Sequence, residues 1–269
     1  MVPPETTNGR IFRMLEYLLK YNVSVVKTLY FNLNYFPLKI AARMPVVIYR
    51  GTRLKSLKGK VELDFLPVKP GAVQIGRKRY GFHTRHHVTV WEQRGGTVIF
   101  GKNIVIGKGT FFMIGEHATL KFGHDISFGG NDKLICKKSV EIGNRTVAAW
   151  DVQITDTDFH PTVNTVFNTL NCAEKPIRIG NHNWLGFGSA ILKGSITPDY
   201  CIVAANTTIR HDHSADGKNI VLGQEPDAKV TARYVRFDMH ASDDQHGKQK
   251  PDPGIVMQDK QSRKSRNTG

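Results

Sequence analysis

The residues best suited to chemistry lie in one short segment, 156–161, which reads Asp-Thr-Asp-Phe-His-Pro. A histidine has a reference pKa near 6.5, and general-base help from such a group is typically worth about 10² to 10⁴ in rate. A carboxylate on the far ring nitrogen would fix the tautomer and stabilise the imidazolium. The segment therefore predicts His160 as a general base, with Asp158 or Asp156 as its orienting partner.

The same segment has a simpler interpretation, in which it is a surface loop whose aspartates cap turns. Its position argues for chemistry. It interrupts a regular repeat directly before Trp184 and Gly186, and long loops without secondary structure of their own are often functional.

The repeat has a period of six residues. Every sixth position from 179 to 209 holds in turn Ile179, Leu185, Ile191, Thr197, Val203 and Ile209, all large aliphatic residues except Thr197. A small or polar residue follows four positions after each of the first five members of this series. A helix needs a period of 3.6 and a half-buried strand a period of two, so neither fits. Six residues suit one flat face of a triangular coil with about 18 residues per turn. We expect an all-β left-handed parallel β-helix.

The pattern also predicts the division of the chain. Residues 1–45 form an N-terminal amphipathic helical segment, and residues 46–238 form the β-helix. Its regular rungs run from about 98 to 212, with a loop insertion at about 155–176. Residues 239–269 are polar and too poor in apolar side chains to order themselves, which predicts a flexible tail.

The N-terminal segment places apolar residues at helical spacing from Gly9 to Tyr30, among them Val25, Val26 and Leu29, with lysines and arginines between them. Two interpretations stay open. The helix packs on the end of the coil or on a neighbouring subunit, or it attaches to a membrane surface.

The formal net charge of +15 suggests nucleic acid as a partner. No nucleic-acid-binding motif accompanies the charge, so we expect no nucleic-acid partner. Phosphates of a co-substrate or an anionic membrane explain the positive net charge as well. No secretory signal and no membrane-spanning stretch is visible, which predicts a cytoplasmic protein, with peripheral contact at the inner membrane face as an alternative. The three cysteines form no CxxC pair, and Cys136 and Cys201 fall in hexads, which favours packing.

Two histidine groups resemble metal ligands only superficially. His83, His86 and His87 lie in one stretch, and His211 and His213 in another. Zinc would require two or three imidazoles to converge, which this spacing does not enforce. We expect surface excursions and no metal.

The hexads, the loop and the stretch Asn183–Gly194 together resemble the left-handed β-helix, hexapeptide-repeat acyltransferases. The closest likeness is to bacterial O-acetyltransferases of polysaccharide and lipopolysaccharide synthesis. The resemblance covers about residues 98–230 firmly, and the tryptophan-leucine-glycine phrase at Trp184 to Gly186 matches the family's usual phrase.

The resemblance implies a homotrimer that uses acetyl-coenzyme A in sites between neighbouring prisms. His160 stands where the family has its general base. Trp184 and Gly186 match residues along the pantetheine arm, and Ala204 and Ala205 match small residues beside the cofactor. Arg210 stands near the family's phosphate-contacting lysine, together with His211.

The sequence thus predicts an O-acetyltransferase acting on a sugar hydroxyl of a glycan or of a nucleotide- or lipid-linked precursor. It would act by direct transfer, since the thioester is already activated and no acyl-enzyme is needed. Three alternatives stay open: an N-acetyltransferase of an amino sugar, a non-catalytic scaffold, and a zinc carbonic anhydrase using His117, His124 and His160.

Overall fold

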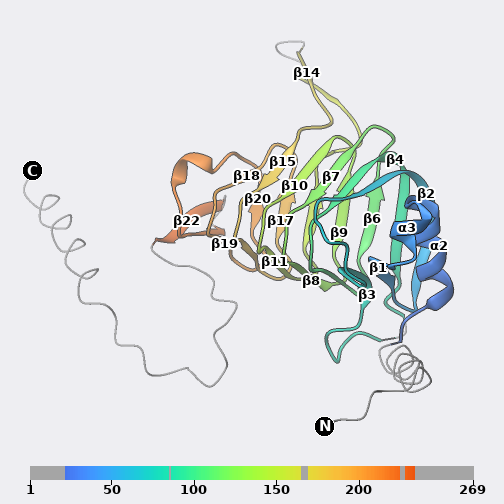
Figure 1. Ribbon diagram of the computed structural model, residues 1–269. Helices are drawn as coiled ribbons and strands as arrows, with labels where there is room; N and C mark the ends of the chain where they lie inside the picture. Colours follow the sequence, from blue (N-terminus) through green and yellow to red (C-terminus); the bar gives the residue numbers. More distant parts are fainter. Residues whose placement is uncertain (1–21, 85, 165–168, 225–227, 234–269) are drawn as a thin grey trace, which may run out of the picture. The chain divides into compact units, whose positions relative to one another are not determined.

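The computed structural model describes residues 22–84, 86–164, 169–224 and 228–233 (Figure 1). Within them the chain winds as a coil whose strands stack in parallel on three faces. The first face holds β1 (Val46–Ile48), β3 (Val73–Arg77), β5 (Ile104–Gly107), β8 (Ile126–Gly130), β11 (Val147–Trp150), β16 (Trp184–Leu185), β19 (Cys201–Val203) and β21 (Ile220–Gln224), and ends on the antiparallel β22 (Ala228–Arg233).

The second and third faces form one continuous sheet, because two long strands bend from one face to the other. These are β2 (Thr52–Leu63) and β4 (Thr89–Phe100), and the first half of β4 pairs with β6 while its second half pairs with β7. The second face continues through β6 (Phe111–Ile114), β9 (Lys133–Cys136), β12 (Gln153–Thr155), β17 (Ala190–Leu192) and β20 (Thr208–Ile209). The third continues through β7 (Thr119–Phe122), β10 (Ser139–Ile142), β15 (Ile177–Ile179) and β18 (Ile196–Thr197).

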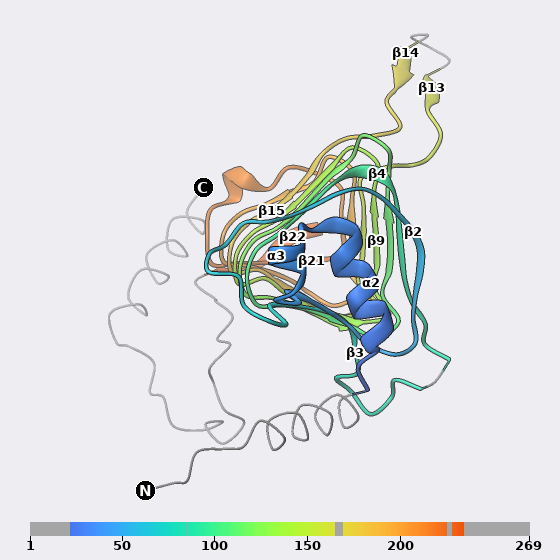
Figure 2. The same cartoon turned by 45° about the vertical axis from the view of Figure 1, so that its right-hand side comes forward.

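The coil is left-handed. Figure 2 looks from the N-terminal end, and the chain passes from the first face to the second and then the third in a counterclockwise sense as it recedes. The predicted left-handed parallel β-helix is confirmed. Its interior is filled by the aliphatic residue of each hexad, as at Ile179, Leu185 and Ile191, together with a stack of aromatic rings near the N-terminal end that includes Trp91 and Phe100.

Regularity increases along the chain, as the sequence predicts. An early turn, in which Ile104 pairs with Ile126, is longer than a late one, in which Trp184 pairs with Ile202. The extra residues lie in the strands, because β5, β6 and β7 span four residues each, whereas β16, β17 and β18 span two or three. The late turns therefore have the shortest faces.

The coil is interrupted where the sequence predicts it. The chain leaves the second face at Thr155 and rejoins the third face at Ile177. Between these points it forms a hairpin of β13 (Thr162–Asn164) and β14 (Thr169–Asn171), which projects away from the prism (Figures 1 and 2).

Two helices, α2 (Val25–Tyr35) and α3 (Leu38–Ala41), cover the N-terminal end of the coil (Figure 2). Val25, Val26 and Leu29 of the predicted apolar stripe are exposed, and α2 packs on the coil through Thr28, Phe31 and Asn32. Packing of this stripe on the end of the coil is therefore wrong for these residues, while contact with a neighbouring subunit and attachment to a membrane stay predictions. In the part of the chain that the structure describes, no helix is long and apolar enough to span a membrane.

Cys136 and Cys201 are buried in the core, which confirms their predicted packing role, and Cys172 is exposed. Burial, followed by the charge of Asp156, raises the pKa of the Cys136 thiol. The helical prediction for residues 9–21 and the predicted tail at 239–269 lie outside the described residues.

Candidate active site

The prism has three edges, and the predicted site residues divide between two of them. We call the edge between the first and second faces the first corner, the edge between the second and third faces the second corner, and the remaining edge the third corner. Asp156, Asp158 and His160 follow β12 at the second corner. Gly186, Ala204 and Ala205 follow β16 and β19 at the first corner.

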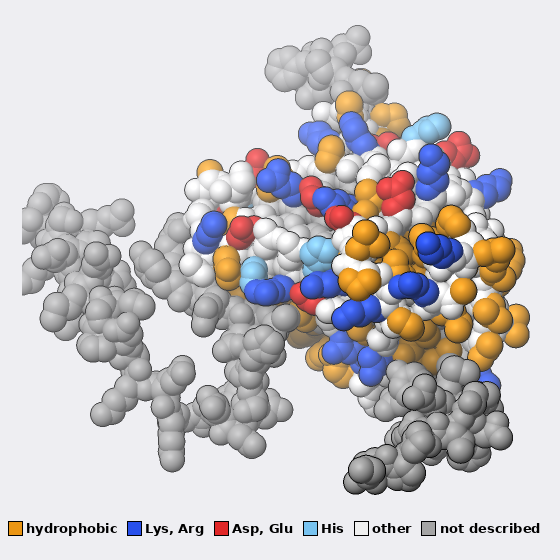
Figure 3. All heavy atoms as spheres, viewed as in Figure 1, with side chains coloured by type: hydrophobic (Ala, Val, Ile, Leu, Met, Phe, Trp, Pro, Cys, Tyr) orange, Lys and Arg blue, Asp and Glu red, His pale blue; other side chains and the backbone are white. Residues whose placement is uncertain are grey.

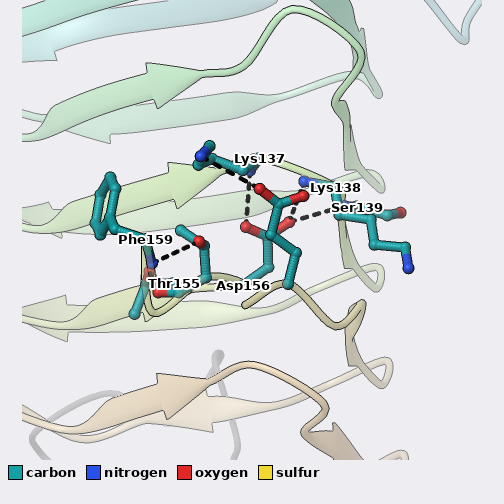
Figure 4. Close-up of polar contacts among 8 residues, drawn as sticks. Lys137, Lys138, Ser139, Thr155, Asp156 and Phe159 are labelled. Atoms are coloured by element: carbon teal, nitrogen blue, oxygen red, sulfur yellow. Dashed lines mark hydrogen bonds and ion pairs between the residues drawn. The ribbon is translucent and has the colours of Figure 1, made fainter. Parts of the chain in front are cut away.

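Asp156 is fully buried and holds the corner of the preceding turn. One carboxylate oxygen accepts a hydrogen bond of 2.7 Å from the backbone N–H of Lys137, and the other accepts bonds of 2.7 Å from those of Lys138 and Ser139 (Figure 4). A carboxylate with three backbone donors is stabilised by charge-assisted hydrogen bonds. Asp156 therefore fixes where the inserted loop leaves the coil, and its oxygens are directed at backbone amides.

Asp158 holds the base of the hairpin from the other side. Its carboxylate forms an ion pair of 2.5 Å with Lys193, which also donates to the carbonyl oxygen of Cys172 at 2.7 Å. On the preceding turn Lys137 pairs with Glu174 at 3.2 Å and lies 5.7 Å from the centre of the Phe159 ring. The base of the hairpin is thus tied to the turns before and after it.

His160 follows Phe159, whose backbone adopts φ 64°. A bulky residue is uncommon in this left-handed region, and such outliers suggest functional constraint. The Phe159 amide donates to Thr157 Oγ1 at 2.9 Å, which stabilises the turn. The His160 side chain is exposed, and within the described residues it makes no hydrogen bond with either Asp156 or Asp158. The single chain positions the histidine without assembling the predicted pair.

Arg210 lies at the second corner, one turn beyond Lys193. It follows β20, and the next residues return to the coil where Ile196 pairs with Asp212. Its side chain is exposed. Arg210 and the insertion that carries His160 therefore both follow strands of the second face, at the same edge of the prism.

The first corner is built from small residues in close contact. Gly186 donates its N–H to the Val203 carbonyl at 2.8 Å, and a Cβ at Gly186 would lie 2.6 Å from the backbone nitrogen of Ala205. Ala205 is exposed and Ala204 partly so, while Trp184 is 38% exposed on the adjoining first face. Gly186 itself is buried, so at this edge Ala204 and Ala205 present backbone and small side chains to solvent.

Sequence reasoning missed an aromatic strip along the same corner. Tyr80 and Phe82 stack at 5.4 Å, and both contact Trp150 edge-on at 5.8 and 5.6 Å. Trp150 in turn stacks on Phe187 at 5.8 Å. All four rings are at least one third exposed. The sequence does show two aromatic residues close together at Tyr80 and Phe82. Only the fold shows that they contact Trp150 and so join a strip that ends at Phe187.

His83 lies beneath this strip and is buried, with neither ring nitrogen hydrogen-bonded within the described residues. Burial, with the nearby charges of His87, Lys108 and Lys78, lowers the pKa of His83. A neutral imidazole packed among Phe82 and Tyr80 fits a structural role. The sequence predicted a surface excursion here, and the burial of His83 shows that this was wrong for its side chain. The same holds for His213, which is buried with its Nδ1 2.8 Å from Asp216 Oδ2.

The third corner carries a polar groove of about 430 Å³, with His182 stacked on Tyr200 at 4.4 Å. His124 lines this groove, whereas His117 and His160 lie at the second corner. The three histidines of the carbonic anhydrase alternative are therefore divided between two edges of the chain. Within the described residues no group of three histidine, cysteine or acidic side chains could hold a metal ion.

The two halves of the predicted site stand on opposite edges of the second face. Gly186 and Lys193 are seven residues apart, which at ~3.3 Å per residue is on the order of 20 Å. A reacting centre needs its groups within hydrogen-bond reach. One chain alone therefore does not bring His160 to the first corner.

No protein-family model and no curated protein sequence matches this chain. Solved structures do: the polysialic acid O-acetyltransferase OatWY is 20% identical over 76% of this chain and 94% of its own, with a TM-score of 0.48. The polySia-specific acetyltransferase NeuO is 17% identical over 74% and 80%, with a TM-score of 0.45. A maltose O-acetyltransferase from Clostridium difficile 630 is 14% identical over 82% and 90%, with a TM-score of 0.37. Likenesses this distant carry no argument about activity.

Proposed function

We propose that the protein is an acetyl-coenzyme A dependent O-acetyltransferase that acts on a sugar hydroxyl of a glycan or of a nucleotide- or lipid-linked precursor. The observation that carries this proposal is the exposed His160 on a hairpin base anchored to the turns on both sides. Such anchoring holds a general base in a fixed geometry, which catalysis requires.

His160 takes the proton of the acceptor hydroxyl as its oxygen attacks the thioester carbonyl carbon. The C–O bond forms, the C–S bond breaks, and the imidazolium returns the proton to the departing thiolate of coenzyme A. The products are an acetyl ester and a free thiol, and the histidine ends as it began. No side-chain nucleophile enters this direct transfer.

The first corner supports a long co-substrate in this proposal. The exposed backbone around Ala204 and Ala205 can approach a pantetheine chain closely, and Trp184 offers an apolar ring beside it. Arg210, an exposed cation at the second corner, is suited to a phosphate. Because the two corners are on the order of 20 Å apart, the proposal includes a homotrimer in which His160 of one subunit meets the first corner of its neighbour.

Thiol release from acetyl-coenzyme A, measured with a panel of nucleotide sugars and oligosaccharides, tests this function. We expect His160→Gln to lower kcat/KM at least 10²-fold with the assembly unchanged by light scattering. His117→Gln, an exposed histidine at the same corner, is the matched control and should keep the wild-type rate. A His160→Gln enzyme with the wild-type rate would remove His160 from the mechanism.

The product distinguishes the acceptor atom. An O-acetyl group is an ester and is lost in mild alkali, whereas an N-acetyl group is an amide and survives. We expect an alkali-labile product. An alkali-stable product would establish the amino-sugar alternative on the same residues.

A further inference from the structure

Helix α2 directs two polar side chains, Thr28 and Asn32, inward together with Phe31. Thr28 Oγ1 accepts from the Ile48 amide at 3.0 Å, and Asn32 accepts from the Val46 amide at 3.2 Å while donating to the Val46 carbonyl at 2.6 Å. Strand β1 is the first of its face, and among the strands that the structure describes it pairs with β3 alone. Thr28 and Asn32 thus satisfy backbone groups that the edge of the sheet would leave unpaired.

The opposite side of α2 is apolar and exposed. Val26, Leu29, Tyr30 and Leu33 follow the i, i+3, i+4, i+7 spacing of one helix face. Val26 is 79% exposed, and Leu38 of the adjoining α3 is 77% exposed. We call these five side chains the apolar end surface. Large apolar residues that share one exposed face of a helix mark an interaction site.

An apolar groove adjoins the apolar end surface. It has a volume of about 490 Å³ and is lined by Val23, Val25, Leu29, Met44 and Val47, among others. Leu29 belongs to both. The apolar area therefore continues from the helix onto the end of the coil.

Positive charge surrounds this area. Residues 22–78 contain eleven lysines or arginines and two acidic residues. Lys39, Arg43, Arg50 and Arg53 are exposed. Figure 3 shows hydrophobic side chains interspersed with lysines and arginines over the end of the molecule that α2 and α3 cover.

We propose that the apolar end surface docks the protein on an anionic lipid membrane. Apolar side chains at the centre would enter the interface between headgroups and acyl chains, and the surrounding cations would meet anionic headgroups. A second copy of this chain fits less well, because a symmetric contact would bring two strongly basic rims together. This inference concerns an end of the coil and does not depend on the proposed acetyl transfer.

Co-sedimentation of the full chain with vesicles of phosphatidylcholine alone, and with vesicles that mix phosphatidylcholine and anionic phosphatidylglycerol, tests the docking. We expect binding to the anionic vesicles that weakens with added salt, and at least a 10-fold lower partition coefficient for Val26→Glu/Leu33→Glu. These side chains face solvent, so the variant should fold. Val163→Glu, an exposed valine on the hairpin, is the control and should bind as the wild type does. Lys39→Gln/Arg53→Gln should bind the anionic vesicles more weakly than the wild type does.

The proposal is overturned if the wild type does not sediment with anionic vesicles, or if Val26→Glu/Leu33→Glu sediments as the wild type does. Light scattering tests the other possible occupant of the apolar end surface, a second copy of this chain. A smaller assembly for Val26→Glu/Leu33→Glu than for the wild type would show that the apolar end surface joins copies of the chain, and this too would overturn membrane docking. Acetyl transfer to a soluble acceptor should be unchanged in the variant.

Discussion

The two aspartates beside His160 have different partners. Asp156 accepts three backbone hydrogen bonds from the preceding corner and is fully buried, whereas Asp158 is half exposed and pairs with Lys193. Asp156 therefore contributes stability to the origin of the loop. Asp158 contributes a surface ion pair, a kind that is usually worth about 0–1 kcal/mol.

Replacing Asp156 by asparagine should destabilise the fold. The amide has one oxygen in place of two, so at least one backbone N–H at Lys137, Lys138 or Ser139 loses its acceptor, and the charge assistance is lost as well. We expect a loss of about 2–4 kcal/mol in the free energy of unfolding, measured by urea denaturation.

Asp158→Asn is the matched control for this change. Its expected cost is below about 1 kcal/mol, because the ion pair with Lys193 is accessible to water. Equal stability of Asp156→Asn and the wild type would contradict the structural role assigned to Asp156.

At the residue scale, sequence reasoning could place His160 but not the partners of its neighbours. The amides that bind Asp156 lie 17 to 19 residues earlier in the chain. That separation is about one turn of the coil, so the pairing depends on which residues share a corner. Local spacing suggested His160 as the partner of Asp156. Only the stacking of turns showed that the backbone amides of the preceding corner are its partners.

At the scale of elements, the first corner depends on residues too small to clash. A Cβ on Gly186 would meet the Ala205 nitrogen at 2.6 Å and the Val203 oxygen at 2.8 Å. Both are backbone atoms of the next turn, which cannot swing aside as a flexible side chain can. The close approach of these two turns therefore requires glycine at this position.

Gly186→Ala should force the two turns apart at the first corner. We expect a loss of about 1–3 kcal/mol in the free energy of unfolding, visible as a lower melting temperature. Gly81→Ala is the control, because a Cβ there would have no atom within 4 Å. If both variants had the melting temperature of the wild type, the two turns at the first corner would be less closely packed than these distances indicate.

The helix α2 shows where an element-scale prediction failed. Hydrophobic periodicity correctly indicated a helix, yet one of its two interpretations, packing of the apolar stripe on the end of the coil, was wrong for Val26 and Leu29. The end of a parallel coil exposes unpaired strand amides and carbonyls, which require polar partners such as Thr28 and Asn32. Hydrophobic periodicity alone does not predict that a helix must supply polar partners for these backbone groups.

At the scale of the whole molecule, the hexads predicted the coil, its regular late turns and the position of its interruption. They could not predict which edge each residue would occupy, because the early turns differ in length, as the pairings of Ser127 with Val147 and of Ile104 with Ile126 show. The division of the candidate site between the first and second corners followed only from the fold. That division is the reason the proposed site requires a neighbouring subunit.

Calorimetric titration of coenzyme A into the purified protein tests the central claim most directly, since a co-substrate must bind whichever acceptor is used. We predict saturable heat for the wild type and for Ala215→Trp, an exposed alanine in the short 3-10 helix Ser214–Asp216. We predict at least 10-fold weaker binding for Ala205→Trp, because the indole would fill the first corner. Absence of heat with the wild type, or equal affinity in Ala205→Trp, would contradict the account.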